Sequence, residues 1–142
     1  GAPAAIEGST PEATALARDL AEALGMKPFE LPPGSRAAYH AAASMASNFL
    51  VALEESAAAL LRDTGLGDSQ DARELLAPLV PRTAANWAEQ GAAALTGPIA
   101  RGDEETVARH LEAIAETAPE LEPLYRELAA RTRALASEGA RA

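Results

Sequence analysis

Four side chains that could do chemistry recur along one segment of the sequence, at His40, Ser44, Ser47 and Asn48. Their spacing places them on one side of a helix, roughly opposite an apolar side. Histidine titrates near neutral pH without help from its surroundings, so His40 could donate a proton or contact a substrate. Asn48 can donate and accept hydrogen bonds at once, which suits a carbonyl, carboxamide or amino-acid-like ligand. Two structural interpretations stay open: His40 as a helix-start residue bonded to a neighbour, and the small polar residues as a helix–helix contact.

A second group of candidates lies in a segment bounded by Gly and Pro, at Thr96, Gly97, Pro98 and Arg101. Gly97 permits a positive φ angle or a close approach of the backbone to a ligand. Arg101 could hold an anion at this loop. An ordinary turn between two helices is the alternative interpretation. The Arg-Gly-Asp run here does not indicate an adhesion motif, because Asp103 is explained better as the cap of the next helix.

The remaining polar and aromatic residues give no recognisable catalytic or metal-binding pattern. Asp103, Glu104 and His110 do not have the spacing of a metal site, and we expect His110 on a solvated helix face. Trp87 and Tyr125 are expected in the core. The sequence contains no nucleophile–base–acid triad, no phosphate-binding loop and no Gly-x-Gly-x-x-Gly motif. Nothing in it therefore predicts that this chain alone binds a nucleotide.

The composition of the 142 residues indicates a close-packed helical protein. Alanine, which is abundant, favours helix and lets helices approach closely. The formal net charge of −9 and the pI of about 4.7 argue against nucleic acid as a partner. The sequence has no cysteine, no apolar run long enough to span a membrane, and no signal-peptide pattern at its start. We therefore expect a soluble, cytoplasmic protein with no nucleic-acid or membrane partner.

Residues 1–34 predict a β-α-β unit that is incomplete by itself. Short strands are expected at residues 3–7 and 27–31, with a helix from about Pro11 to Leu24 between them. A capping hydroxyl, a proline and an acid mark the start of this helix, and Gly25 marks its end. Its expected apolar face contains Leu16, Leu20, Ala23 and Leu24. One such unit does not bury both faces of a parallel sheet, so a partner chain or the rest of a larger α/β domain should cover it.

After Pro33 the sequence predicts about four helices. A segment from about Ser35 to Thr64 contains no Pro or Gly and is expected to form one long helix, ending near Gly65-Leu66-Gly67. Its apolar side should face the core, with Ala46, Phe49, Leu50, Leu53, Ala57, Leu60 and Leu61.

The second helix should run from about Ser69 to Gln90, with a kink or break near residues 77–82. Pro78 and Pro81 each remove a backbone donor there. Two further helices should begin at Asp103 and Pro119. The expected apolar faces are Leu76, Leu79, Val80, Thr83 and Trp87 in the second helix, Val107, Leu111, Ile114 and Ala118 in the third, and Leu121, Leu124, Tyr125, Leu128 and Leu135 in the last.

Four runs carry a resemblance to a known family: YHAAASMASNFLVAL, LAPLVPRTAANW, ALTGPIARGDEETVARHLEAI and LYRELAARTRALA. They resemble the C-terminal helical domain, of unknown function, in a Rossmann-like NAD(P)-binding oxidoreductase family. That domain is similar to the C-terminal domains of pyrroline-5-carboxylate reductase and 6-phosphogluconate dehydrogenase. The resemblance covers about Ser35 to Ala136, and residues 3–31 look like the last β-α-β of the nucleotide-binding domain. It implies a mainly α fold: a 6-phosphogluconate dehydrogenase C-terminal-domain-like bundle at 35–142, preceded by a β-α-β remnant of a Rossmann domain at 1–34.

The resemblance also implies a function. NAD(P) would bind in the full-length parent and not to this chain alone. The helical domain would close over the nicotinamide, contact a small-molecule substrate and form a homodimer through the long helix. The implied reaction is hydride transfer to a C=O or C=N group. An alternative is a non-enzymatic, Ala-rich helical module that dimerises or binds a ligand.

Site residues follow from the same resemblance. His40 and Asn48 would be catalytic and would polarise or protonate the reacting group. The anionic end of the substrate would be held by Arg101 or by the backbone at Thr96 and Gly97. No cofactor-binding or metal-binding residue is expected in this chain. The implied substrate-binding residues are Ser47, Thr96, Gly97, Pro98 and Arg101.

Overall fold

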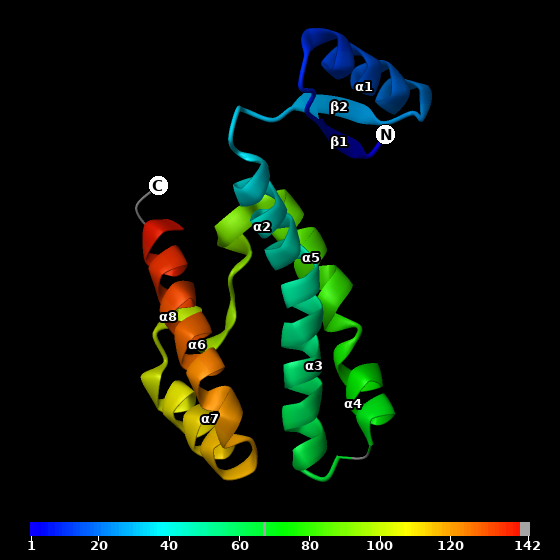
Figure 1. Ribbon diagram of the computed structural model, residues 1–142. Helices are drawn as coiled ribbons and strands as arrows, with labels where there is room; N and C mark the ends of the chain where they lie inside the picture. Colours follow the sequence, from blue (N-terminus) through cyan, green and yellow to red (C-terminus); the bar gives the residue numbers. More distant parts are fainter. Residues whose placement is uncertain (67, 140–142) are drawn as a thin grey trace. The chain divides into compact units, whose positions relative to one another are not determined.

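The computed structural model describes residues 1–66 and 68–139. The chain is mainly α-helical, with one two-stranded parallel sheet near its N-terminus (Figure 1), so the predicted fold class is confirmed. Two compact units are formed, Gly1–Leu50 and Val51–Ala142. The assignment of residues 1–34 and 35–142 to separate domains stays a prediction. Among the described residues, no helix is long and apolar enough to cross a membrane.

The predicted β-α-β motif opens the first unit, as β1 (Pro3–Ile6), α1 (Pro11–Ala23) and β2 (Lys27–Glu30). The strands pair in parallel, with Ile6 opposite Glu30. Thr10 caps α1, because its hydroxyl accepts a hydrogen bond from the Ala13 backbone N–H at 3.2 Å. The chain leaves the helix through Gly25, whose φ of 69° suits glycine. Local sequence signals therefore suffice to place all three elements.

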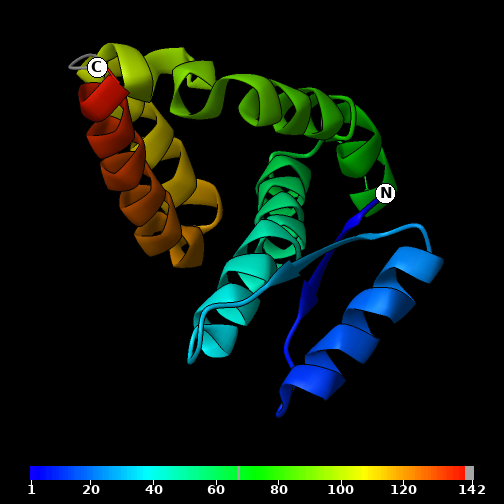
Figure 2. The same ribbon diagram turned by 90° about the horizontal axis from the view of Figure 1, so that it is seen from above.

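α1 lies along the two strands (Figure 2) and contacts both of them. Arg18 of α1 forms an ion pair with Glu30 at the end of β2. Ile6 and Ala21 are the buried residues of this unit among those described. The leucines of the predicted apolar face lie elsewhere: Leu16, Leu20 and Leu24 are 61%, 58% and 76% exposed. The apolar side of α1 is thus not the side that packs on this sheet.

The segment predicted as one helix from Ser35 to Thr64 is two helices, so that prediction is wrong. α2 (Arg36–Ala46) and α3 (Asn48–Asp63) meet at Ser47, whose φ of −121° and ψ of −73° lie outside the helical region. The Ser47 hydroxyl donates a hydrogen bond to the Ala43 carbonyl at 2.7 Å. Such a bond to the preceding turn competes with the backbone, but the same bond from Ser56 to the Ala52 carbonyl leaves α3 unbroken, so the bond alone does not account for the break. The absence of Pro and Gly hid this break from the sequence pattern.

The break predicted in the following helix is confirmed. α4 (Ser69–Leu76) is capped at its start by Asp68, which takes part in a capping box with Asp71. α5 (Leu79–Gln90) begins after Pro78. Pro81 falls in the first turn of α5, where a missing N–H leaves no helical hydrogen bond unmade.

α3 ends at Asp63, close to its predicted end. Gly65 there has a φ of 85°, and Gly67 lies outside the described residues. An exposed ion pair joins α3 to α4, with 3.4 Å between Glu55 Oε1 and an Arg73 guanidinium nitrogen. The buried residues of these two helices are Ala58 and Ala72.

Most of the buried residues of the second unit belong to its C-terminal part. The elements there are η1 (Gly91–Ala94), α6 (Gly97–Arg101), α7 (Glu104–Thr117), η2 (Pro119–Leu121) and α8 (Glu122–Gly139). α7 and α8 lie side by side, and α6 contacts both (Figures 1 and 2). The predicted starts at Asp103 and Pro119 are confirmed, the latter as the short η2 that leads into α8. The buried side chains here are Val107, Ile114, Ala118 and Ala129, of which the first three were predicted.

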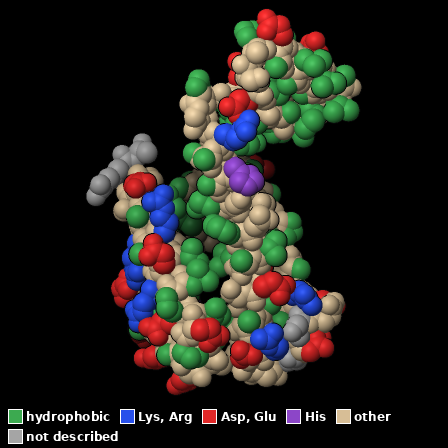
Figure 3. Space-filling view, viewed as in Figure 1, with side chains coloured by type: hydrophobic (Ala, Val, Ile, Leu, Met, Phe, Trp, Pro, Cys, Tyr) green, Lys and Arg blue, Asp and Glu red, His purple; other side chains and the backbone are tan. Residues whose placement is uncertain are grey.

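The apolar sides of α3 and α5 are largely exposed in this chain, contrary to prediction. Phe49 is 61% exposed, and Trp87, expected in the core, is 66% exposed. Leu50 and Leu53 are also exposed, and Figure 3 shows hydrophobic side chains at the surface along α2 and α3. Apolar periodicity predicts that a helix side will be covered, but it does not say which chain covers it. The sequence therefore predicted a larger buried core than this chain forms by itself.

We expect Ile114→Ala to lower the free energy of unfolding by about 2–4 kcal/mol, because Ile114 is 3% exposed and its loss leaves a cavity. Leu66→Ala is the control, at a position that is 57% exposed. It should change the free energy of unfolding by less than about 0.5 kcal/mol. Urea unfolding followed by circular dichroism measures both. Equal losses in the two variants would contradict the core described above.

Candidate functional site

The polar side chains of the first candidate group lie on both sides of the bend at Ser47. His40, Ser47 and Asn48 are exposed, while Ser44 is half-buried. The Ser47 hydroxyl donates its hydrogen bond to the Ala43 carbonyl, so its oxygen remains available only as an acceptor. Within residues 1–66 and 68–139, neither His40 nor Asn48 has a side-chain hydrogen bond. Both side chains are therefore free to meet a ligand or another chain.

The second candidate group is more helical than predicted. Its segment was expected to be a loop, but residues 97–101 form the short helix α6, with Pro98 in its first turn. Gly97 has a φ of 90° and Gly102 a φ of 72°, so both need the freedom of glycine. Arg101 is exposed in the last turn, with no ion pair to any described residue. Pro98 favours helix here because its fixed φ suits a first turn.

Asp103 performs the capping role that the sequence predicted. Its carboxylate accepts hydrogen bonds from the backbone N–H of Thr106 at 3.1 Å and from the Thr106 hydroxyl at 2.8 Å. These two bonds, the backbone one first, hold the pKa of Asp103 below its ordinary value. The Arg-Gly-Asp run is thus the boundary between α6 and α7.

His110 lies exposed on its helix, as the sequence predicted, and it also contacts another helix. Its Nδ1 lies 2.7 Å from the Tyr125 hydroxyl oxygen, which joins α7 to α8. The two rings also meet edge to face, with centroids 6.0 Å apart. Burial raises the pKa of Tyr125, and the charge of Arg133 opposes that shift. Tyr125 is half-buried rather than a full core residue.

A signal for this contact was present in the sequence. His110 and Tyr125 lie about equally far on either side of Ala118, and so do Glu104 and Arg133. The second pair is an ion pair across the same helices, with nitrogen–oxygen distances of 3.1 and 2.8 Å. A hairpin of two antiparallel helices with its turn at Ala118 brings such symmetric positions together.

The candidate residues fall into two groups by compact unit. His40, Ser47 and Asn48 belong to Gly1–Leu50, and the segment from Thr96 to Arg101 belongs to Val51–Ala142. That the groups form one site stays a prediction.

The sequence matches a family model, described as "Domain of unknown function (DUF2520)", over residues 2–132. The chain belongs to the DUF2520 family. The match spans the β-α-β motif and nearly all of the helical part. A search among curated proteins found no match.

A solved structure gives the fold-level counterpart of this DUF2520 chain. It is described as "putative NADP oxidoreductase", from Bacteroides fragilis, and shares 29% sequence identity with a TM-score of 0.77. The similarity covers 92% of the present chain but 49% of the other, so the chain spans about half the length of that protein. The resemblance noted in the sequence is therefore confirmed at the level of family and fold.

The β1–α1 turn of the DUF2520 chain does not have the form of a dinucleotide-binding loop. A hollow of about 500 Å³ lies there, and its lining includes Ser9, Thr10 and the Arg18–Glu30 pair. Gly8 does not widen this hollow, because a Cβ on it would come within 2.5 Å of the Thr14 backbone nitrogen. Gly8 instead lets the strand end pack closely against α1.

Two other features of the described residues are structural. A cavity of about 270 Å³ lies between α7 and α8, lined in part by Tyr125, Arg126 and Arg133. Its arginines already pair with Glu122 and Glu104. Among residues 1–66 and 68–139, no group of three or more His, Asp and Glu side chains could hold a metal ion.

We expect Asn48→Ala to leave the free energy of unfolding within about 0.5 kcal/mol of the parent value, because Asn48 is exposed. The same variant should weaken catalysis in the full-length protein if Asn48 contacts the substrate. Thermal unfolding and steady-state kinetics measure the two effects. A loss of stability of about 2 kcal/mol or more would show that Asn48 is a packing residue instead.

Asp103→Ala should lower the melting temperature at neutral pH and have little effect in strong acid. The folded-state pKa of Asp103 is depressed, so its carboxylate contributes stability above the ordinary value of 3.8. That contribution is lost as the pH falls through the lower, folded-state pKa. Asp103→Asn, which keeps a capping oxygen, is the control and should show a smaller loss. A loss independent of pH would contradict the capping role.

Proposed function

We propose that the chain is the helical substrate and dimerisation part of an NAD(P)-dependent oxidoreductase, separated here from its cofactor-binding part. The observation that carries this proposal is the similarity to the Bacteroides fragilis protein described as "putative NADP oxidoreductase". It extends over 92% of the present chain and leaves about half of that protein unmatched. Since the sequence has no Gly-x-Gly-x-x-Gly motif, the cofactor would be held by the part outside it.

The uncovered side of the β-α-β motif supports a larger nucleotide-binding domain. Leu16, Leu20 and Leu24 form an exposed apolar stripe on α1. A two-stranded parallel sheet is also too small to be stable with open edges. Further strands and a neighbouring helix would cover both features and complete a Rossmann-type domain.

A homodimer through α3 would cover the other large apolar surface. Phe49, Leu50 and Leu53 are exposed on the side predicted to be apolar. Monomeric proteins rarely expose a continuous apolar stripe of this kind. A second copy of the chain, packing α3 against α3, provides a surface of matching chemistry.

The candidate side chains would then contact the substrate of the parent enzyme. Bound NAD(P) supplies hydride transfer, which here would act on a C=O or C=N group. His40 would hold or donate a proton at a ring nitrogen, and Asn48 would donate a hydrogen bond to the same group. Ser47 would accept one, and the segment from Thr96 to Pro98 with Arg101 would hold an anionic end.

A second candidate is a non-enzymatic helical module that dimerises or binds a ligand. The exposed apolar sides of α3 and α5 favour it, because they indicate a binding partner without requiring a cofactor. In that case the polar side chains around Ser47 would belong to the interface.

The first test is nucleotide binding and molecular mass. NADPH and NADH are titrated into this chain and into the full-length gene product, with mass measured by light scattering. We expect the long product to bind a nucleotide, this chain to bind neither, and both to be dimers. Failure of the long product to bind either nucleotide would favour the non-enzymatic module.

The dimer is tested by Leu53→Asp, which would place an uncompensated charge in the apolar seam. A buried charge of this kind costs roughly 3 kcal/mol or more, so the dimer should weaken at least a hundredfold. The matched control is Val51→Asp, since Val51 is 63% exposed and lies on the opposite side of α3. Sedimentation at several concentrations measures the dissociation constants. A Leu53→Asp protein that stays a folded dimer would remove this side of α3 from the interface.

A further inference from the structure

Two side-chain contacts join the start of α2 to the end of the parallel sheet. An ion pair links Glu7, which directly follows β1, to Arg36, the first residue of α2, with 2.7 Å between Glu7 Oε2 and Arg36 Nε. An aromatic pair links Phe29 of β2 to Tyr39 of α2, edge to face, with ring centroids 5.9 Å apart. All four residues lie in the unit Gly1–Leu50.

The alternation of side chains along β2 explains why both contacts are possible. Glu30 points to the sheet face covered by α1, since it pairs with Arg18. Phe29, the preceding residue, therefore points to the opposite face. Tyr39 covers part of the face that α1 leaves open. α1 thus lies on one face of the two strands, and the Tyr39 ring of α2 contacts Phe29 on the other face.

The connection between β2 and α2 also has a defined turn. The Ser35 backbone N–H and the Ser35 hydroxyl both donate hydrogen bonds to the Pro32 carbonyl, at 3.0 and 2.7 Å. Gly34 supplies the positive φ of 78° that this turn requires. Pro32 and Pro33 stiffen its entry. The turn therefore sets the direction in which the chain enters α2, and the two side-chain contacts follow it along the chain.

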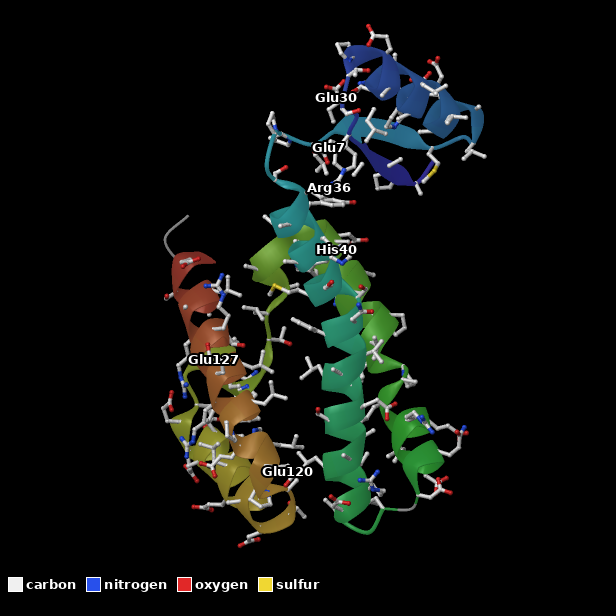
Figure 4. All side chains as sticks on the ribbon, in the orientation of Figure 1. Glu7, Glu30, Arg36, His40, Glu120 and Glu127 are labelled. Atoms are coloured by element: carbon white, nitrogen blue, oxygen red, sulfur yellow. The ribbon has the colours of Figure 1, made fainter. Side chains whose placement is uncertain are left out.

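His40 lies one helical turn after Arg36, on the same side of α2. Figure 4 shows Glu7 and Arg36 pointing toward one another at the start of α2, with His40 further along the helix. The contacts at Arg36 and Tyr39 thus connect the turn that carries His40 to the sheet at two points. In open α/β sheets, ligands bind beyond the carboxyl ends of the strands, where Glu7 and Glu30 stand.

We propose that the Glu7–Arg36 ion pair and the Phe29–Tyr39 contact form a two-point dock that positions His40 beside the carboxyl ends of the parallel strands. These four are positioning residues, since they act through α2. The docking itself follows from the contacts in this chain. Its value for catalysis rests on the proposed function, in which His40 must be held at a set place relative to the cofactor-binding part.

The test uses the ring signals of the two histidines in the NMR spectrum of this chain. The variant Glu7→Gln/Phe29→Leu removes both contacts from the sheet side and leaves the neighbours of His40 in sequence unchanged. We expect the His40 ring signal to shift by more than its linewidth. The His110 signal, from the other compact unit, should stay in place. Amide exchange of residues 39–43 should quicken by about threefold to tenfold, the range expected for loss of an aromatic pair.

Glu30→Gln is the matched control. It removes an ion pair from the same strand, but on the face that packs against α1. It should leave the His40 signal unchanged. Exchanging the charges, with Glu7→Arg and Arg36→Glu together, should restore the slow amide exchange of residues 39–43 that Glu7→Gln quickens. If the double variant unfolds, the single variants Glu7→Gln and Phe29→Leu should each give a smaller shift.

An unchanged His40 signal in the folded double variant would overturn the dock. An equal shift in Glu30→Gln would also overturn it, because general loosening of the sheet would then explain both. No nucleotide or substrate enters the experiment. The NMR test can therefore support the dock even where the full-length product does not bind NADPH. It can also overturn the dock where the full-length product does bind NADPH.

Discussion

The apolar sides of α1, α3 and α5 are largely exposed to water, where they contribute no stabilisation from burial. Eight described residues form its buried core, and five of them are alanine, while sixteen large hydrophobic side chains are exposed. Each square ångström of apolar surface left in water forgoes about 25 cal/mol of stabilisation. The chain thus holds its helices together with little buried area. Its abundance of alanine favours helix but supplies few bulky side chains for packing.

Two interruptions divide the helical part, and only one of them is marked by a proline. At Pro78 the backbone lacks a donor, so the sequence alone predicts a break. At Ser47 every backbone donor is present and no proline marks the break, although the Ser47 hydroxyl bonds the Ala43 carbonyl. The bend at Ser47 changes the direction of Asn48 relative to His40. The polar side chains that a straight helix would align on one side are therefore divided between α2 and α3.

The sequence predicted local structure well and long-range packing poorly. Thr10, Asp103, Gly25 and Pro78 placed helix ends correctly, because caps and breaks depend on a few adjacent residues. Trp87 was misplaced, because its surroundings depend on what covers α5. The arrangement of the candidate site was harder still to predict from the sequence. Asn48 and His40 were selected by residue type. The dock proposed to position His40 involves Glu7, which lies far from it in sequence.

The β-α-β motif favours the oxidoreductase proposal over a simple helical module. A dimerisation module requires α3 and the helices around it, but it does not require two parallel strands with an uncovered face. Here those strands hold α1 on one face through Arg18 and receive Tyr39 of α2 on the other. The helix that carries His40 thus contacts the sheet through Tyr39. A two-stranded parallel sheet with a helix on one face is what the proposed nucleotide-binding domain would contribute.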